Sequence, residues 1–447
     1  MKQGVIETYE ENQLVVAISD LAAVRGALGD LPVGRQVEEH DERLGLALLT
    51  LADVGAGAAE LRAGHSGLAG RVKRARPAGS PTGIEPSDLD LLIFWLREHF
   101  GSAYSGWVPT MGKNRVIDPV RGLPYVGGGG EGDPYFGGSG DPRTTSGANG
   151  GTIAEAPVLA PPPRWTPRAA TPGQGVRVGL LDTRLYPNEW LAGGYLAAAD
   201  DLLQIPATGG TPPPASAGHA TFVAGLILRR APGAELVVRP VLNEKAFGRA
   251  WDVAREMASF IGSGVDILNL SFGCYTDDGE PPLVLARAVS LVSAEILLVA
   301  AAGNHGDIDE LRKEGKVKDA SWTRGLHDRT PMWPAALDEV VAVGATDGDE
   351  LAPFSPETPW VDMTAPGVNV ESTYMTGKVK LTESDGSPTA TFSNGFAYWS
   401  GTSFAAATVS GAVAARMSPG RRTARQALAS IREAPQGDIR PFAKPDR

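Results

Sequence analysis

Cysteine is almost absent from this sequence. Cys274 is the single cysteine among 447 residues, so the chain can form no internal disulfide and has no set of thiolates to hold a metal ion. A chain without disulfides fits a reducing compartment. The first residues also lack the apolar core of a secretory signal, because Glu7, Glu10 and Glu11 interrupt them. Together these features predict a cytoplasmic protein.

Long apolar runs and an excess of positive charge are lacking as well. The longest clearly apolar run, residues 296–302, is far shorter than the roughly 20 residues that span a bilayer, so we expect no association with a membrane. The formal net charge of −11 argues against nucleic acid as a partner, because phosphate binding needs clustered Lys and Arg. The length predicts two or three domains.

Glycine and proline are abundant, but they are concentrated in one stretch of the chain. Between about residues 126 and 175 the sequence contains Gly127–Gly130 and Pro161–Pro163. Such a composition is typical of a linker or an extended arm. We therefore expect a Gly/Pro-rich linker over residues 106–175.

The segment before the linker has the pattern of a small α+β domain. Apolar runs at residues 14–18 and 44–51 predict strands. The spacing of apolar residues over 88–100 predicts a helix, with Ser87 as its cap. These elements place an N-terminal domain over residues 1–105.

After the linker, short apolar runs alternate with helical patterns. The runs are typical of strands buried in a parallel sheet, at 176–181, 235–242, 265–272, 296–302 and 340–343. Helices are predicted between them, at 221–229, 249–261 and 283–292. The alternation predicts an open, mostly parallel α/β sheet with helices on both faces over residues 176–434, followed by a tail over 435–447. Functional residues in such sheets lie beyond the carboxyl ends of the strands.

Two residues capable of acid–base chemistry occupy positions of this kind. Asp182 follows the strand at 176–181, and His219 begins a helix in the segment Gly218–Gly225. Each has an ordinary alternative when taken alone. An aspartate after a strand is more often a turn residue or a helix cap, and a lone histidine is more often a surface or core residue.

Ser403 and Asn304 add partners to these two residues. Ser403 begins a predicted helix that ends near Met417, where a backbone N–H without a helical partner and the helix dipole favour negative charge. It can therefore supply both a nucleophile and an oxyanion donor. Asn304 follows the strand at 296–302 and can direct its amide to the same cleft. An N-cap serine and a turn asparagine are the alternatives, but the four residues together favour a catalytic group.

These segments resemble the subtilisin-like serine peptidases, or subtilases, over about residues 176–434. Three segments match the motifs around the catalytic residues of that family: Asp182-Thr183, His219–Gly225 and Gly401–Ala405. Three more resemble its oxyanion-hole motif, its substrate-pairing strand and a landmark upstream of the serine: Ala301–Asn304, Asn269–Gly273 and Ala365–Gly367. The resemblance implies a subtilisin-like fold.

The resemblance also implies a serine endopeptidase that acts on polypeptide substrates. Ser403 would attack the peptide carbonyl, His219 would act as general base and then general acid, and Asp182 would orient His219. Asn304 would help to bind the oxyanion.

The substrate backbone would pair with Ser271, Phe272 and Gly273, according to the same resemblance. Many relatives insert a calcium-binding loop in the region that corresponds to residues 224–238, whereas this chain runs there almost directly from helix to strand. We therefore expect no required metal and no cofactor.

The role of residues 1–105 has two competing interpretations. Relatives carry an N-terminal prodomain that assists folding and inhibits the enzyme in cis, with a cleavable junction behind it. The alternative is a regulatory or targeting domain, because the segment shows no matching motif of its own.

Two other functions and one question of specificity stay open at this point. A serine hydrolase of another fold would need a G-x-S-x-G elbow, whereas Ser403 lies in Gly-Thr-Ser-Phe-Ala. A non-enzymatic descendant could bind peptides in the same cleft. Acidic residues after the oxyanion motif would favour a basic residue before the scissile bond, unless they belong to a solvated loop: Asp307, Asp309, Glu310 and Glu314.

Overall fold

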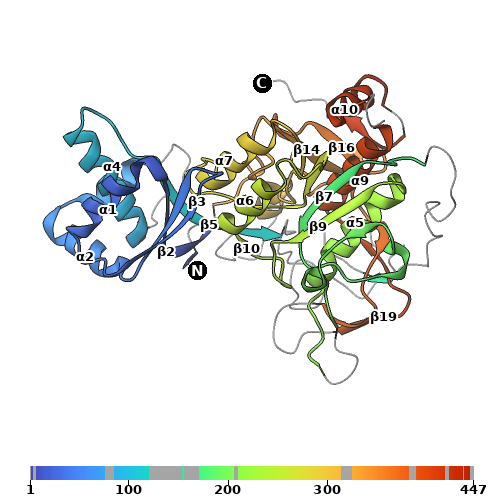
Figure 1. The fold of residues 1–447 in the computed structure, drawn as a ribbon, viewed down its shortest axis with the longest axis horizontal. Coiled ribbons are helices and arrows are strands. Elements are labelled where there is room, and N and C mark those ends of the chain that lie inside the picture. The colour runs from blue at the N-terminus through green and yellow to red at the C-terminus, as the bar shows by residue number, and fades with distance from the viewer. Residues whose placement is uncertain are drawn as a thin grey trace.

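The chain folds into two domains that lie side by side (Figure 1). The computed structural model describes residues 2–3, 7–75, 85–119, 154–155, 171–205, 210–313, 325–381, 389–417, 422–435 and 437–442. We call the described residues up to 119 the N-terminal domain and those from 154 to 442 the large domain. Among the described residues, no helix has the length and apolar character needed to cross a membrane.

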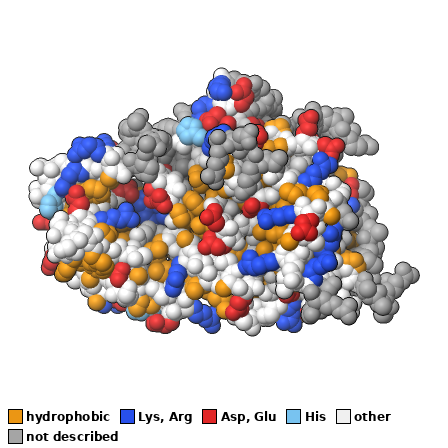
Figure 2. Space-filling model, turned by 90° about the horizontal axis from the view of Figure 1, so that it is seen from above, with side chains coloured by type: hydrophobic (Ala, Val, Ile, Leu, Met, Phe, Trp, Pro, Cys, Tyr) orange, Lys and Arg blue, Asp and Glu red, His pale blue; other side chains and the backbone are white. Residues whose placement is uncertain are grey.

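An antiparallel sheet with helices on one face forms the N-terminal domain. Its strands are β1 (Lys2–Gln3), β2 (Thr8–Ala17), β3 (Gln36–Asp41), β4 (Leu46–Leu51) and β5 (Met111–Pro119). Its helices are α1 (Leu21–Gly29), α2 (Val54–Gly64), α3 (Leu68–Ala75) and α4 (Asp88–Ala103). Ser87 caps α4, since its hydroxyl accepts from the Asp90 N–H at 3.1 Å. Acidic and basic side chains are interspersed over the face seen in Figure 2.

Strand β5 departs from the expected linker, which was predicted to begin at residue 106. The strand runs to Pro119 and pairs with β2. Its middle residues Lys113, Asn114 and Arg115 look like solvent-facing residues in the sequence, yet all three are buried. They are hidden because partners from both domains satisfy their polar groups, and a pattern of hydrophobicity cannot reveal such pairing.

A mostly parallel sheet forms the centre of the large domain, as the sequence predicted. Its strand order is β21-β16-β14-β13-β11-β7-β9-β8, with β15 attached to β14. The parallel strands are β7 (Arg177–Asp182), β8 (Tyr195–Leu196), β9 (Glu235–Pro240), β11 (Ile267–Leu270), β13 (Leu297–Ala301), β14 (Val340–Asp347) and β16 (Met363–Pro366). The antiparallel ones are β15 (Glu350–Leu351) and β21 (Arg440–Pro441). Strand β21 lies in the expected tail of residues 435–447, where two paired residues extend the sheet edge.

Helices cover both faces of this sheet because its strands are apolar on both sides. In β13, Leu297 and Val299 face the core that contains α5 (His219–Arg230) and α9 (Thr402–Arg416). The alternate residues Leu298 and Ala300 face the core that contains α6 (Ala250–Ser259) and α7 (Leu283–Val292). The remaining α-helices are α8 (Ile308–Lys313) and α10 (Ala424–Glu433). Short 3-10 helices are η1 (Ile18–Asp20), η3 (Glu189–Leu191), η4 (Ala199–Asp201) and η5 (Ala215–Gly218).

Two small sheets complete the large domain. One has the order β17 (Val370–Thr373), β20 (Phe396–Trp399), β6 (Ala154–Glu155), and the other joins β18 (Gly377–Lys380) to β19 (Thr389–Phe392). Strand β6 lies within the segment that was expected to be a linker, and it pairs with β20.

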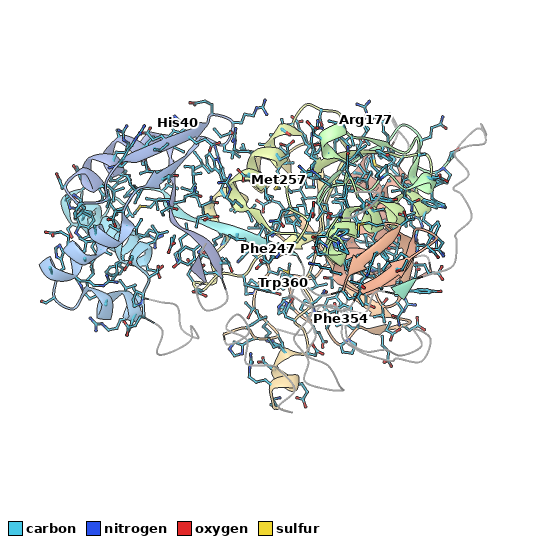
Figure 3. All side chains as sticks on the ribbon, turned by 90° about the horizontal axis from the view of Figure 1, so that it is seen from below. His40, Arg177, Phe247, Met257, Phe354 and Trp360 are labelled. Carbon is cyan, nitrogen blue, oxygen red and sulfur yellow. The ribbon has the colours of Figure 1, made fainter. Side chains whose placement is uncertain are left out.

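Strand β5 joins the two domains. Its last residues pair in turn with β10 (Gly248–Arg249) and β12 (Phe272–Gly273) of the large domain, antiparallel to both. The two domains also share an apolar core, to which the N-terminal domain contributes Val15, Leu44, Leu46, Leu48 and Ile117. Figure 3 shows Phe247 and Met257 on the large-domain side of this junction.

Buried charges accompany the shared core. Glu7 accepts hydrogen bonds from Lys113 and, at 2.9 Å, from Arg115 Nε. The Glu7 carboxylate also accepts from the Asp277 N–H of the large domain at 3.3 Å, and Arg115 reaches Asp278 at 3.0 Å. We call Glu7, Lys113, Arg115, Asp277 and Asp278 the junction cluster.

Candidate active site

Asp182 and His219 form a buried pair. Asp182 is the last residue of β7 and His219 the first residue of α5, so the carboxyl end of a strand meets the start of a helix. The His219 Nδ1 lies 2.8 Å from Asp182 Oδ1 and 2.9 Å from Oδ2. The Thr183 N–H donates to the same carboxylate at 2.7 Å. The carboxylate thereby fixes the imidazole with Nε2 as its remaining basic nitrogen.

Aromatic rings hold the other side of His219. The imidazole centroid lies 5.8 Å from the Trp399 ring and 5.6 Å from the Phe404 ring. Phe222 packs behind them, 4.5 Å from Phe404. Because Phe404 directly follows Ser403 on α9, these contacts bring His219 to the first turn of that helix.

Ser403 lies against the segment that was predicted to bind substrate. Its hydroxyl donates to the Ser271 carbonyl at 3.2 Å, and the Ser271 hydroxyl donates to the Ser403 carbonyl at 2.9 Å. No hydrogen bond joins Ser403 to His219 among the described residues. Such bonds are often long in a free enzyme and tighten when substrate binds, so the hydroxyl has to turn from Ser271 toward the imidazole.

Asn304 is oriented by the residue that begins α9. Its side-chain oxygen accepts from the N–H and from the hydroxyl of Thr402, both at 3.0 Å. The Gly303 N–H donates to the same hydroxyl at 3.1 Å. These bonds assign the oxygen of the amide to Thr402, so the nitrogen end is the one able to donate toward an oxyanion.

A chain of neutral polar groups under Ser403 was missed at the sequence level. The Ser410 hydroxyl donates to Asn269 Oδ1 at 3.0 Å, and Asn269 Nδ2 donates to the Ser271 hydroxyl at 2.9 Å. All of these side chains are fully buried. The spacing of Ser403 and Ser410, two turns apart on one helix face, was the available signal. We call Ser410, Asn269 and Ser271 the support chain.

The edge of β12 is already paired in this structure. Phe272 lies opposite Pro119, and Gly273 lies opposite Asp118, both in the antiparallel register with β5. The segment expected to pair with substrate therefore pairs with the end of the N-terminal domain.

No group of three or more His, Cys, Asp or Glu side chains is arranged to hold a metal ion within the described ranges. The arrangement at Ser403 consists of a hydroxyl, an imidazole, a carboxylate and an amide. Such a set is suited to nucleophilic acyl transfer.

The comparisons with known proteins agree with this geometry. The subtilase family model matches residues 173–429, more than half of the chain. A thermophilic serine proteinase from Bacillus sp. (strain AK1) is 32% identical over 209 residues, covering 46% of this chain and 41% of that protein. Subtilisin Savinase from Lederbergia lenta is 33% identical over 215 residues, covering 45% of this chain and 67% of that protein.

The solved structure of fervidolysin from Fervidobacterium pennivorans, a keratinolytic enzyme related to subtilisin, is also similar. It has a TM-score of 0.49 at 17% sequence identity, and the match covers 93% of this chain and 55% of that chain. This chain spans less than half of the Bacillus serine proteinase.

Proposed function

This chain belongs to the subtilase family, and we propose that it is a serine endopeptidase that acts through an acyl-enzyme on Ser403. Ser403 Oγ attacks the peptide carbonyl carbon while His219 Nε2 takes its proton. The protonated imidazole gives that proton to the leaving amine, and water then releases the acyl group by the same route. Asp182 orients the imidazole and stabilises its charged form. The buried Asp182–His219 pair beside the first turn of α9 carries this proposal.

The tetrahedral intermediate develops a negative oxygen, which needs donors. The Asn304 amide and the Ser403 N–H at the start of α9 supply them. Thr402 supports this role, because it holds the amide oxygen on the far side.

A fluorophosphonate probe and casein cleavage test the enzyme proposal. The full-length chain should be labelled and should release casein fragments, whereas Ser403→Ala should lose both, with a fall in kcat of about 10⁶-fold. Ser400→Ala is the matched control, since it removes a neighbouring hydroxyl that accepts from the Asn369 N–H. If Ser403→Ala is still labelled, another residue is the nucleophile. If the wild-type chain is neither labelled nor active, the peptide-binding alternative gains support.

As a second part of the proposal, we infer that the N-terminal domain inhibits the large domain in cis. A substrate strand and β5 cannot both pair with the same edge of β12. The variant Ile117→Asp places a charge in the shared core and should raise the initial rate of peptide cleavage by the uncut chain. Val37→Asp, at a position 51% exposed on the same domain, is the control. Full activity of an intact wild-type chain would contradict inhibition.

The self-cleavage site lies between Pro119 and Ala154. Strand β5 pairs with β2 of the N-terminal domain and ends at Pro119, opposite Phe272 of the large domain, whereas Ala154 and Glu155 pair with β20 of the large domain. This range lies within the linker expected over residues 106–175, and the residues between 119 and 154 lie outside the described part of the chain.

A further inference from the structure

Two segments flank the proposed nucleophile. Strands β11 and β13 are neighbours, with Leu270 opposite Ala300. The chain after β11 contacts Ser403 through Ser271, and the chain after β13 contacts Thr402 through Gly303 and Asn304. The two segments therefore lie next to the start of α9, one in contact with Ser403 and the other with Thr402.

The pairing of β5 supplies a register for a substrate in the same groove. Asp118 lies opposite Gly273, and Pro119 lies opposite Phe272. A substrate in this register has its next residue opposite Ser271, the residue in contact with the Ser403 hydroxyl. That substrate residue carries the scissile carbonyl. Its side chain lies on the same face of the pair as those of Ser271 and Gly273, because opposite residues share a face and faces alternate along a strand.

Met332 occupies this face. A Cβ added to Gly273 would lie 2.9 Å from Met332 Cγ, and one added to Gly303 would lie 2.9 Å from Met332 Sδ. The thioether thus fills the gap between the two segments, and Met332 is only 2% exposed. A Cβ at Gly273 would also meet the Trp333 carbonyl oxygen at 2.7 Å, and one at Gly303 would meet His305 Nδ1 at 2.7 Å, so Met332 shares this space with two neighbours. The φ of +113° at Gly303 favours glycine there in any case.

The neighbours of Met332 leave its side chain little room to move out of the gap between the two segments. The next residue, Trp333, exchanges two backbone hydrogen bonds with Cys274, at 2.8 and 2.9 Å. His305 lies on the other side of the gap, next to Gly303. Its Nδ1 contacts the Tyr275 hydroxyl at 2.9 Å, and its Nε2 contacts the Thr330 carbonyl at 2.9 Å. Burial lowers the pKa of His305 to about 4, so this wall is neutral at pH 7.

Two of the nearby acidic residues make local ion pairs, whereas Asp307 has a buried Oδ1, and burial raises the pKa of its carboxyl to about 6. Asp309 binds Arg312 at 2.6 Å, and Glu310 binds Lys313 at 3.0 Å. Glu314, which was also considered as a source of basic specificity, lies outside the described residues. The side chains nearest to Gly273 and Gly303 are those of Met332 and neutral His305, and the Tyr275 hydroxyl contacts His305.

On the basis of the proposed peptidase activity, we propose that Met332 determines specificity and restricts the residue before the scissile bond to glycine, alanine or serine. A larger side chain in the register of β5 would collide with the thioether. The chain is thereby a peptidase for sequences with small residues at the cleavage point.

A matched series of peptide nitroanilides that differ only in a final Ala, Phe or Lys tests this proposal with the self-processed full-length chain. The wild-type enzyme should prefer Ala. Met332→Gly should raise the ratio of kcat/KM for Phe to that for Ala by at least about 10-fold, the effect of a methylene or more in an apolar pocket. Met332→Leu, which conserves volume, should leave the ratio unchanged. The ratio does not depend on the fraction of folded enzyme.

Fluorophosphonate labelling separates the two proposals. A labelled wild-type enzyme that prefers Phe or Lys, or that cleaves none of the three peptides, contradicts the role of Met332 and leaves Ser403 as nucleophile. An unchanged ratio in labelled Met332→Gly contradicts it as well. An enzyme that is not labelled contradicts the proposed peptidase activity itself.

Discussion

The molecule buries two polar networks of different chemistry. Under Ser403 the support chain consists of neutral hydroxyl and amide groups, each with a hydrogen-bond partner. At the domain junction the buried groups are ions, and Glu7 is 1% exposed between Lys113 and Arg115. A neutral network keeps its geometry over a wide pH range, whereas an ionic one depends on the charge of every member. The difference fits our proposal of a rigid catalytic centre and an inhibitory N-terminal domain that separates from it.

Asp182 supplies the carboxylate of the proposed catalytic centre, and among the changes that compare the two networks its replacement should have the largest effect. We expect Asp182→Asn to lower kcat by about 10⁴-fold, because the amide holds the wrong tautomer of His219. Steady-state kinetics on a peptide substrate measure this change. Asp200→Asn makes the same change of charge at an exposed residue and should have no effect. A loss of less than 10-fold in Asp182→Asn would mean that the carboxylate only fills space.

Glu7→Gln should have the largest effect at the junction. Removing one partner of a buried ion pair costs about 3–5 kcal/mol of unfolding free energy, because the remaining charges stay buried. Denaturant titration of the full-length chain in the Ser403→Ala background measures this loss without self-cleavage. Asp278→Asn is the control, because Asp278 pairs with Arg115 as Glu7 does but has a side chain that is 48% exposed. We therefore expect this variant to lose at most about 1 kcal/mol of unfolding free energy. Equal costs for both variants would contradict an ionic junction.

The Glu7 carboxylate also determines how acid affects the stability of the full-length chain. Burial alone would raise the pKa of Glu7, but the charges of Arg115 and Lys113 outweigh it and lower the pKa from 4.5 to about 2. The stabilisation is therefore present above pH 4.5 and is lost as the pH falls from 4.5 through 2. Thermal melting of full-length Ser403→Ala should show this loss, and Glu7→Gln should remove its part of the pH dependence. A variant with the same pH profile as its parent would rule out Glu7 as the responsible group.

Ser410→Ala should have a smaller effect on the neutral network. It leaves the Asn269 oxygen without its hydroxyl donor, which costs about 1–3 kcal/mol of unfolding free energy. We expect kcat/KM near that of the parent, because Ser271 still contacts Ser403. Val409→Ala, at a buried neighbour, is a control for the loss of volume. A drop in kcat with unchanged stability would instead show that the support chain positions the nucleophile directly.

EDTA should change neither the peptide cleavage rate nor the stability of the protein. Within the described ranges, no three His, Cys, Asp or Glu side chains are grouped to hold a metal ion. Peptide cleavage and the melting temperature should both stay unchanged after dialysis against EDTA. A joint fall in activity and stability, restored by calcium, would reveal a metal site.

The sequence was more informative about the catalytic centre than about the junction. Asp182, His219, Asn304 and Ser403 stand at strand ends or helix starts, so local patterns predicted both their elements and their approximate placement. The sheet and its two layers of helices followed from apolar runs. Aromatic packing around His219 and the contact of Ser403 with Ser271 depend on long-range geometry, which no local pattern contains.

The junction was missed because its residues look ordinary. Lys113 and Arg115 read as exposed residues of a linker, and only pairing with Glu7, about a hundred positions earlier, makes their burial possible. Asn114 is a similar case, since it accepts from the Trp251 N–H at the start of α6 at 3.0 Å. Such partners, distant in the sequence, become visible only in the folded structure.

Intact mass and casein cleavage, followed over time for the wild-type chain and Ser403→Ala purified side by side, test most directly whether Ser403 is the nucleophile and whether the N-terminal domain inhibits it. We predict that the wild-type chain cuts itself between Pro119 and Ala154, that casein cleavage rises as the N-terminal domain is lost, and that Ser403→Ala stays intact and inactive. A wild-type chain that cleaves casein at full rate while it remains uncut would contradict inhibition by β5, and cleavage by Ser403→Ala would contradict the catalytic assignment.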